Sequence, residues 1–225
     1  KGNIDPAIRR LGRFADDIEV IYVEGHSSDG TLEECERVKA AYPDWDIKVT
    51  TQDGRGKGNA VWKAFDMASG DVLMILDADL TMPPEQLPKF FNAIASGKGE
   101  FINGSRLVYP MEQGAMRFLN LIANRLFAAI FSYLLNQRFT DTLCGTKVMR
   151  RSDYRRIADN RSYFGDFDPF GDFDLIFGAA KLNMKITEIP IRYADRTYGE
   201  TQISRFHDGW ELIKMVVFAW RKLKA

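Results

Sequence analysis

The 225-residue chain lacks the features that define several special classes of protein. Its two cysteines, Cys35 and Cys144, lie far apart in the sequence without a second pair. A disulfide framework and a structural zinc motif are therefore not indicated, and reduced thiols are the simplest interpretation. The chain also contains no fixed-period repeat and no low-complexity linker. We expect one continuous domain over residues 1–225.

An excess of charge and long apolar runs are missing as well. The 31 Lys and Arg balance the 31 Asp and Glu, so the formal net charge is zero. Without a basic excess there is no overall electrostatic footprint for nucleic acid, and we expect no nucleic-acid partner. No apolar run approaches the roughly 18 residues of a membrane-spanning helix. Spanning is therefore not expected, whereas attachment to a membrane surface stays open.

The first two thirds of the chain alternate short apolar runs with helical patterns. The strand-like runs are residues 18–23, 47–51 and 72–76, and the helical patterns after them are 32–41, 59–68 and 84–94. This alternation predicts an α/β fold with a mostly parallel mixed sheet flanked by helices. Ligands of such sheets bind at the carboxyl ends of the strands. A helical pattern over residues 6–14 precedes the first strand, so we expect a further strand upstream of Lys1.

Asp77 and Asp79 are the strongest candidates for chemistry. They follow the apolar run 72–76 and precede the helix start at residues 81–85. Two carboxylates at the end of a buried strand can hold a divalent cation, Mg²⁺ or Mn²⁺, against a phosphate. The spacing itself is a weak signal, because four Asp-x-Asp pairs occur where roughly two are expected from the Asp content. A capping Asp with an acidic neighbour is the alternative.

Two further segments follow predicted strands. The glycine-rich run at residues 54–59 opens a helix, where Gly56 allows close backbone approach and Lys57 supplies a positive charge. Such a segment suits a diphosphate, and a flexible connecting loop explains it equally well. Glu24, at the end of the first strand, can accept hydrogen bonds from a base or a ribose. Residues 29–31 after it are typical of a turn that caps the next helix.

The second half carries scattered cations and an acidic, aromatic loop. Arginine forks suit phosphate oxygens, but isolated arginines are usually solvated, so these residues matter only if the fold brings them together. The cations beside loops are Arg106, Arg117, Lys147, Arg192 and Arg196. Residues 164–174 place four Asp among four Phe, which indicates either a second metal site or a turn with Asp caps. Asp172 and Asp174 are candidates for orienting a substrate hydroxyl.

Two helical patterns, residues 114–137 and 205–224, are rich in large apolar side chains and bordered by Arg and Lys. Both are too short to span a membrane. Amphipathic helices with basic flanks are typical of the membrane interface. Helices that cover the sheet or a partner domain would show the same pattern. We retain both interpretations.

Taken together, these segments resemble the family 2 glycosyltransferases of the GT-A fold, and within them the dolichyl-phosphate mannose synthases and dolichyl-phosphate β-glucosyltransferases. The resemblance covers nearly the whole chain. The matching motifs, in the family's order, are residues 27–31, 56–58, 77–80 with 83–85, 104–106, 141–145, 188–190 and 195–200. One such motif would be weak evidence, and seven in order are specific.

The resemblance implies an inverting transfer of a sugar from a UDP- or GDP-linked donor to a polyprenyl phosphate, with Mg²⁺ or Mn²⁺ on the diphosphate. It implies that Asp79 ligates the metal and that Asp77 lies near both ribose and metal. The implied donor contacts are Glu24, Gly56 and Lys57, and the implied acceptor-phosphate contacts are Arg106, Arg117 and Arg196. Such an enzyme would be a peripheral protein at the cytoplasmic face of a membrane.

Two other functions remain open. A related transferase could act on a soluble or cell-surface glycan, and it would need a carboxylate base such as Asp172 or Asp174. A noncatalytic nucleotide-sugar-binding domain could instead regulate a larger polypeptide. The presence of both Asp77 and Asp79 argues against the second of these.

Overall fold

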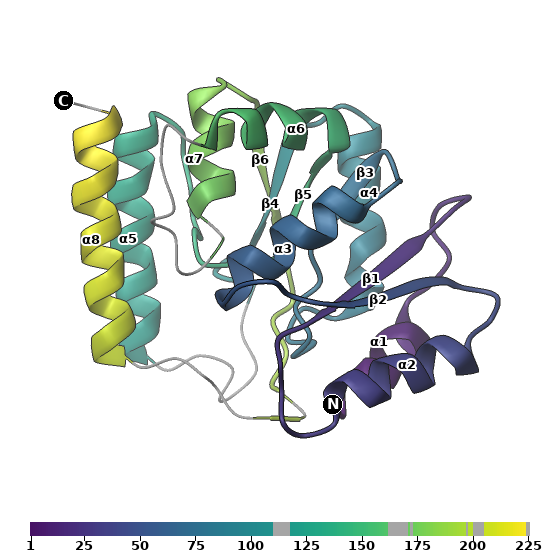
Figure 1. Cartoon of the computed structure of the whole chain (residues 1–225). Coiled ribbons are helices and arrows are strands. Elements are labelled where there is room, and N and C mark those ends of the chain that lie inside the picture. Colours follow the sequence, from purple (N-terminus) through teal and green to yellow (C-terminus); the bar gives the residue numbers. More distant parts are fainter. Residues whose placement is uncertain (110–117, 162–170, 172, 197, 200–204, 224–225) are drawn as a thin grey trace.

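The computed structural model (Figure 1) describes the chain except residues 110–117, 162–170, 172, 197, 200–204 and 224–225. The helices are α1 (Ile4–Arg10), α2 (Thr31–Ala41), α3 (Gly56–Met67), the 3₁₀ turn η1 (Pro84–Gln86), α4 (Leu87–Ala95), α5 (Phe118–Leu135), α6 (Arg151–Asp159), α7 (Phe173–Lys181) and α8 (Arg205–Leu223). The strands are β1 (Glu19–Glu24), β2 (Asp46–Thr51), β3 (Val72–Met74), β4 (Phe101–Ser105), β5 (Lys147–Arg150) and β6 (Ile186–Pro190).

The strands form two sheets. β1 and β2 pair in parallel, with Glu19 opposite Asp46, and the other four strands lie in the order β3-β5-β4-β6. In this larger sheet β5 runs antiparallel to β3 and β4, whereas β4 and β6 are parallel. The predicted α/β class with a mixed sheet is confirmed. The prediction that the first three strands share one sheet is wrong for the described residues, because β1 and β3 belong to separate sheets.

Apolar side chains of β4 and β5 alternate between the two faces of the larger sheet and contribute to an apolar core on each face. Phe101 and Met149 join the apolar cluster with side chains from α3, α5, α6, α7 and α8. Their neighbours Ile102 and Val148 join a second cluster with α4. Successive side chains of a strand point to opposite faces, so this division follows from the period of two. Helices therefore cover both faces, which positions the carboxyl edge of the sheet as its accessible end.

Two predicted elements are shorter than expected. α1 ends at Arg10 instead of continuing to residue 14, because Leu11 is extended and Gly12 follows it. β3 ends at Met74 instead of residue 76, although the Ile75 N–H still donates to the Lys147 carbonyl. The chain thus leaves the regular ladder just before Asp77.

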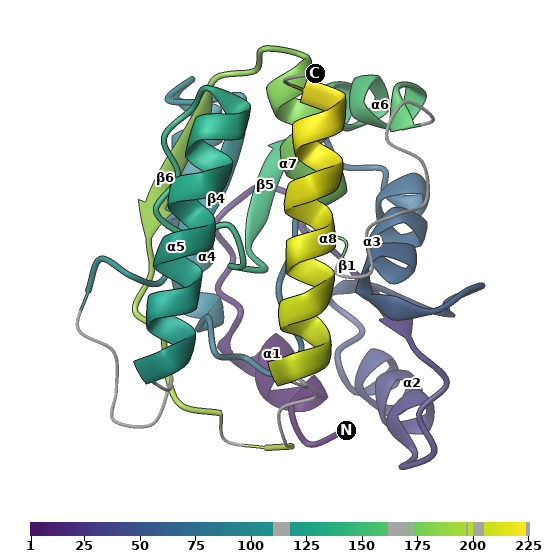
Figure 2. The same ribbon diagram turned by 90° about the vertical axis from the view of Figure 1, so that its left-hand side faces the viewer.

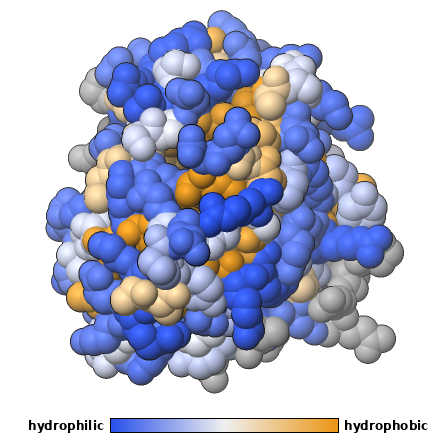
Figure 3. All heavy atoms as spheres, turned by 90° about the vertical axis from the view of Figure 1, so that its right-hand side faces the viewer, coloured by the Kyte–Doolittle hydropathy of each residue, from blue (hydrophilic) through white to orange (hydrophobic). Residues whose placement is uncertain are grey.

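α5 and α8 form an outer layer at one side of the molecule (Figure 1), and they run side by side in the view of Figure 2. Within the described part of the chain, no helix combines the length and apolar character needed to cross a bilayer. The opposite side of the molecule is largely hydrophilic, with an apolar patch near its centre (Figure 3).

Candidate active site

The topology brings the predicted site residues to one edge of the larger sheet. β3, β4 and β6 all run opposite to β5, so their carboxyl ends share an edge with the amino end of β5. Asp77 and Asp79 follow β3, and Arg106 follows β4. Arg196 comes after β6, and Gly145 precedes β5. Residues from four separate parts of the sequence therefore gather at this edge.

Asp77 lies in a cationic environment. Its Oδ1 pairs with Lys57 Nζ at 2.8 Å, and both side chains are about one third exposed. Burial works against ionisation of the carboxyl, but the charge of Lys57, and then those of Lys147 and Arg106, hold its pKa below the usual range. Asp77 is therefore a carboxylate at neutral pH.

Gly145 has no side chain, and Asp77 and Lys57 occupy the space where its Cβ atom would lie. A Cβ atom at this position would overlap Asp77 Oδ2 and Lys57 Nζ. Only a glycine lets the backbone before β5 approach the pair this closely. The motif at residues 141–145 thus contributes shape to the site as well as side chains.

Asp79 lies two residues further on, in a tight turn. The Leu80 N–H donates to the Asp77 carbonyl, and buried Leu80 adopts a left-handed conformation with φ 55°. A non-glycine residue in this region stores of order 1 kcal/mol of strain, and such strain is concentrated at functional sites. Asp79 Oδ1 accepts from the Thr81 N–H at 3.1 Å, and Oδ2 pairs with Arg196 Nη2 at 2.7 Å. Asp79 therefore caps its turn with one oxygen and directs the other toward Arg196.

The two carboxylates fit the way proteins hold Mg²⁺ or Mn²⁺ on a diphosphate. In the described residues, no group of three or more His, Cys, Asp or Glu side chains could hold a metal alone. Mg²⁺ in phosphoryl-binding sites is usually held by one or two carboxylates together with phosphate oxygens and waters. The donor set of Asp77 and Asp79 matches this incomplete protein ligation.

The start of α3 places Lys57 at this edge. Gly56 opens the helix with φ 81°, and the Gly54 N–H donates to Asn59 Oδ1 at 2.8 Å. Gly171 packs against the backbone of Gly58, where a Cβ on Gly171 would overlap the Gly58 Cα and N atoms. The amino end of α3 therefore lies beside the Lys57 ammonium at this edge, and the binding of an anion by this segment stays a prediction.

Glu24 is buried at the end of β1 and serves its own loop. Its carboxylate accepts from the backbone N–H groups of His26 at 2.8 Å and Ser27 at 2.6 Å. Burial opposes its ionisation, but the hydrogen bonds from Ser27 and His26 keep its pKa below the usual range. Its contact with a nucleotide stays a prediction.

Arg106 is held by a buried carboxylate. Its Nε and Nη2 donate to Asp141 at 2.6 and 2.8 Å, and its backbone N–H donates to the same side chain. Asp141 is fully buried, and Asn124 Nδ2 donates to it at 3.1 Å. Burial penalises the Asp141 charge, but the Arg106 guanidinium outweighs it and keeps the carboxyl pKa low. This pair fixes the orientation of Arg106 at the edge.

Glu188 of β6 supports that arrangement and had no role assigned from the sequence. Its carboxylate accepts from the Thr140 N–H at 2.8 Å and the Asp141 N–H at 3.2 Å. It therefore fixes the turn that carries Asp141. Asp141 and Glu188 both belong to the ordered motifs at residues 141–145 and 188–190, which marked them in the sequence. The motifs do not indicate which residues they contact.

The remaining predicted residues lie apart or outside the description. Asp174 is buried at the start of α7, where its Oδ2 pairs with Arg161 Nε at 3.1 Å. The Arg161 guanidinium in turn stacks over Trp62, 4.2 Å from the ring centre. Arg117 and Asp172 fall outside the described residues. The acceptor-binding roles of these three candidates stay predictions.

Comparisons with known proteins identify the family to which the chain belongs. Residues 1–158 match the family model described as glycosyl transferase family 2. The low-salt glycan biosynthesis hexosyltransferase Agl6 of Haloferax volcanii is 30% identical over 170 residues, which are 75% of this chain and 40% of that protein. The dolichyl-phosphate hexose transferase of the same organism is 30% identical over 201 residues, which are 88% of this chain and 79% of that protein.

The fold also has solved counterparts. Glucosyl-3-phosphoglycerate synthase from Mycobacterium tuberculosis, crystallised with Mn²⁺, UDP and glucosyl-3-phosphoglycerate, has a TM-score of 0.65 at 16% identity. The match covers 99% of this chain and 75% of that one. At this identity the likeness concerns the fold. The chain spans only 32% to 59% of the length of Agl6 and two further Haloferax glycosyltransferases, AglJ and AglD.

Proposed function

The chain belongs to glycosyl transferase family 2, and from this membership and the geometry of its edge site we propose a metal-dependent, inverting transfer of a sugar from a nucleoside diphosphate to a polyprenyl phosphate. Its fold is that of the GT-A glycosyltransferases, and it is a glycosyltransferase by family. One observation supports the proposal most strongly: Asp77, Asp79 and Lys57 meet at the carboxyl edge of the sheet.

The donor is proposed to be a UDP- or GDP-linked sugar whose diphosphate lies between the start of α3 and the turn at residues 77–80. The N–H groups at the start of α3 and the Lys57 ammonium would attract the diphosphate oxygens. Mg²⁺ or Mn²⁺, held by Asp77 and Asp79, would neutralise the charge that develops on the leaving nucleoside diphosphate. Glu24 would orient the nucleotide through the loop that it organises.

The acceptor is proposed to be a polyprenyl phosphate. A related protein is named for dolichyl phosphate, and Arg106 and Arg196 stand at the edge where a phosphate would approach the donor. A phosphate oxygen is already anionic at neutral pH, so it can attack the anomeric carbon without a strong base. The bond to the leaving diphosphate breaks as the new bond forms on the opposite side of the carbon, which inverts its configuration.

The state of Asp174 favours this acceptor over a glycan hydroxyl. A hydroxyl acceptor needs a carboxylate that can take its proton. Asp174 is buried and shares its charge with Arg161, which is the environment of a structural carboxylate. Transfer to a soluble glycan remains the alternative function that the experiment must distinguish from this proposal.

The outer surface of α5 and α8 supports a location at a membrane surface. Leu126 and Tyr133 of α5 and Trp210 of α8 each expose about 60% of their surface. The exposed large apolar residues are Ile122, Leu126 and Tyr133 on α5, and Trp210, Ile213, Val217 and Trp220 on α8. Spacings of three, four and seven between successive or alternate members place them along one face of each helix. We refer to these seven residues as the outer apolar face.

The same two helices are apolar on their inner side, where Phe131 of α5 and Met215 of α8 are buried. A helix that is apolar on two faces buries only one of them against its own domain. The exposed Arg125 and Arg221 beside the outer apolar face would add attraction to anionic lipids. We propose peripheral attachment at the cytoplasmic face of a membrane, where a lipid-linked acceptor is presented.

The test is a donor screen followed by transfer. Calorimetry with UDP- and GDP-sugars, each with and without Mn²⁺ or Mg²⁺, should identify one donor whose binding requires the cation. That donor should then transfer its sugar to a polyprenyl phosphate in detergent, with inverted anomeric configuration by NMR. The proposal fails if no donor binds with metal, or if a soluble glycan is the better acceptor.

Asp79→Asn provides the decisive variant. It removes a charge from the metal site but keeps the shape and the acceptor for the Thr81 N–H, so the melting temperature should stay near that of the parent. Transfer should fall at least 100-fold, because the diphosphate then meets an incomplete cation site. Undiminished transfer by this variant would remove the carboxylate pair from the mechanism.

A further inference from the structure

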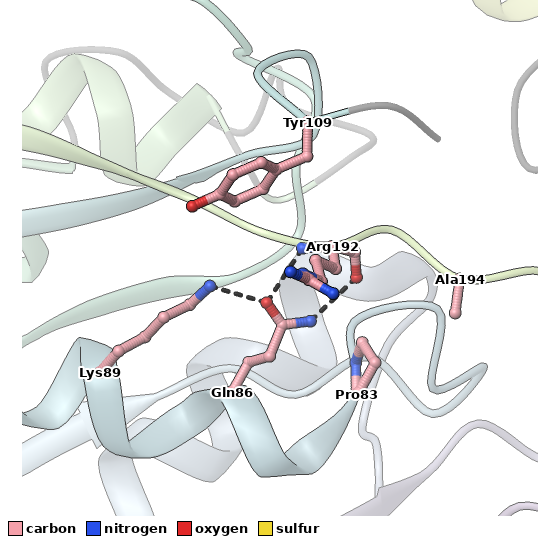
Figure 4. A pocket seen from close by; sticks show the side chains of 6 residues that line it. All are labelled: Pro83, Gln86, Lys89, Tyr109, Arg192 and Ala194. Atoms are coloured by element: carbon pink, nitrogen blue, oxygen red, sulfur yellow. Dashed lines mark hydrogen bonds between the residues drawn. The ribbon is translucent and has the colours of Figure 1, made fainter. Parts of the chain in front are cut away.

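A separate pocket lies between α4 and the segment that follows β6 (Figure 4). Its volume is about 410 Å³, and its lining residues are Pro83, Gln86, Lys89, Tyr109, Arg192 and Ala194. None of these residues was assigned to the donor or acceptor above. The pocket therefore needs an explanation of its own.

Three donor groups converge on this pocket. Figure 4 shows the Lys89 ammonium, the Tyr109 hydroxyl and the Arg192 guanidinium directed into the same space. Arg192 lies over the Tyr109 ring, with 5.9 Å from its guanidinium carbon to the ring centre. An ammonium, a phenol and a guanidinium fork are the side chains that proteins use to bind phosphate oxygens.

In the part of the chain that the structure describes, the two cations lack acidic partners. Lys89 Nζ donates to Gln86 Oε1 at 2.7 Å and to the Pro190 carbonyl, both of which are uncharged. Arg192 has no ion pair among the described residues. Burial lowers the pKa of Lys89, and the neighbouring charge of Arg192 lowers it further. Two like charges in one pocket repel each other, so an anion placed between them would be stabilised by both.

Gln86 holds the pocket in shape. Its Oε1 accepts from the Arg192 N–H at 2.9 Å, and its Nε2 donates to the Arg192 carbonyl at 2.8 Å. This two-point clamp fixes the backbone of Arg192 against the start of α4. A preformed site loses less conformational freedom when a ligand binds.

We infer that this pocket is a phosphate-binding subsite in which Lys89, Arg192 and Tyr109 bind one phosphate group. It is distinct from the carboxylate site, because its lining includes neither Asp77 nor Asp79. The phosphate belongs either to a lipid headgroup or to a free phosphate compound. The inference stands apart from the proposed transfer, since binding can be measured without any donor sugar.

The two sites share a segment of chain. The Ala194 N–H donates to the Thr81 carbonyl at 2.9 Å, and Arg196 pairs with Asp79 two residues later. Residues 192–196 therefore run from the pocket to the turn that carries the carboxylates. A phosphate bound at Arg192 would stabilise this segment close to the catalytic edge.

The first arm of the test uses inorganic phosphate. In ¹H–¹⁵N NMR at constant ionic strength, phosphate should produce saturable shifts at residues 86–89 and 192–194, and chloride should not. The variant Lys89→Gln/Arg192→Gln should bind phosphate at least 10-fold more weakly, since each charge-assisted hydrogen bond is lost.

The single variant Arg192→Gln changes only an exposed side chain and should show a smaller loss in the same direction. Lys39→Gln/Arg155→Gln is the matched control, because it removes the same charge from exposed positions on α2 and α6 and should bind as the parent does.

The second arm uses vesicles of phosphatidylglycerol mixed with phosphatidylcholine. A lipid source predicts that recruitment to these vesicles falls in Lys89→Gln/Arg192→Gln and not in the matched control. A free phosphate source predicts equal recruitment of both variants, together with the phosphate shifts of the first arm. The inference is overturned if phosphate gives no saturable shift and vesicle recruitment is unchanged, or if Arg192→Gln and the double variant behave as the parent in both arms.

Discussion

At the residue scale, the candidate site consists of charges that are paired across long distances in the sequence. Lys57 reaches Asp77 from α3, and Arg196 reaches Asp79 from the segment after β6. The charge of Lys57 keeps Asp77 ionised although burial opposes it. The site is therefore charged and oriented before any substrate binds.

Lys57→Ala should weaken donor binding by about 1–3 kcal/mol, the usual contribution of a charge-assisted hydrogen bond. Calorimetry with the preferred donor and Mn²⁺ measures this loss. Lys63→Ala is the matched control on the same helix, because Lys63 pairs with the exposed Asp53 instead of the site. Equal donor affinity in Lys57→Ala and the parent would make the glycine-rich segment a simple connector.

Asp141→Asn should destabilise the protein by about 3–5 kcal/mol at neutral pH, because it leaves the Arg106 side chain, which is only 13% exposed, without its counter-charge. The low pKa of Asp141 in the folded protein means that its stabilisation is complete above the unfolded value near 4. It is lost as pH falls through the lower folded value. The difference between parent and variant in urea unfolding should therefore be largest above about pH 4 and shrink below it.

Asp53→Asn is the control for this pH series. Its carboxylate is exposed and pairs with Lys63 at the surface, so its loss should cost less than about 1 kcal/mol at any pH. A constant gap between Asp141→Asn and the parent from pH 7 to pH 3 would contradict the assignment.

The charged residues of the candidate site could be identified from the sequence, whereas the residues that hold them in position could not. Asp77, Asp79 and Lys57 follow strands whose apolar runs are visible in the sequence, so each could be placed near the carboxyl end of a strand. The contact of Lys57 with Asp77 could not be predicted from this pattern, because β2 and β3 belong to separate sheets. Asp141 and Glu188 lie 47 residues apart and meet through the pairing of β4 with β6. Such a contact depends on strand order, which local patterns do not encode.

At the element scale, strands were not predicted where both of their faces are buried, because apolar and polar residues then do not alternate along the sequence. All five residues of β4 are buried, so the strand shows no alternation of apolar and polar residues. β5 carries the fully buried Lys147, whose Nζ donates to the Cys144 carbonyl. α6 was missed for the opposite reason: most of its residues are charged, and of its apolar side chains only Tyr154 and Ile157 are buried in the core. By contrast, α2, α3, α4, α5 and α8 lie close to their expected positions.

The turn before β5 yields a prediction at this scale. Gly145→Ala should leave the melting temperature nearly unchanged, because the added methyl group meets the ends of two side chains and not backbone. It should lower transfer at least 10-fold, because Asp77 and Lys57 must move apart to admit it. Gly12→Ala is the control, since a Cβ there meets nothing within 4 Å. Full activity of Gly145→Ala would show that the position of the Asp77 carboxylate is not critical.

At the scale of the whole molecule, polar and apolar surfaces are unevenly distributed. The side seen in Figure 3 is largely hydrophilic, whereas the helices on the other side, facing the viewer in Figure 2, carry the outer apolar face. An exposed apolar patch of this kind usually marks an interaction site. The candidate site lies at the carboxyl ends of β3, β4 and β6, and α5 follows β4 in the chain. If α5 bound the bilayer as proposed, a lipid phosphate would be held near Arg106 and Arg196, the proposed acceptor contacts.

Leu126→Ser/Trp210→Ser should therefore abolish flotation with liposomes that contain anionic lipid, while the parent floats. Each residue contributes about 2 kcal/mol if its exposed apolar surface enters the lipid, so the two together change partitioning by roughly 1000-fold. Both side chains are exposed, so the fold should tolerate the changes. Met67→Ser, at the exposed end of α3, is the control and should float as the parent does.

Activity separates this surface from the catalytic edge. Transfer to a polyprenyl phosphate embedded in vesicles should fall with flotation in Leu126→Ser/Trp210→Ser. Calorimetric binding of the donor should be unchanged, because both substituted side chains are largely exposed on α5 and α8. If the parent stays in the unbound fraction and transfers well to a water-soluble sugar, the outer apolar face has a different partner and the acceptor is a glycan. If the double variant loses donor binding as well, the two helices support the site itself, and the membrane interpretation of the face is wrong.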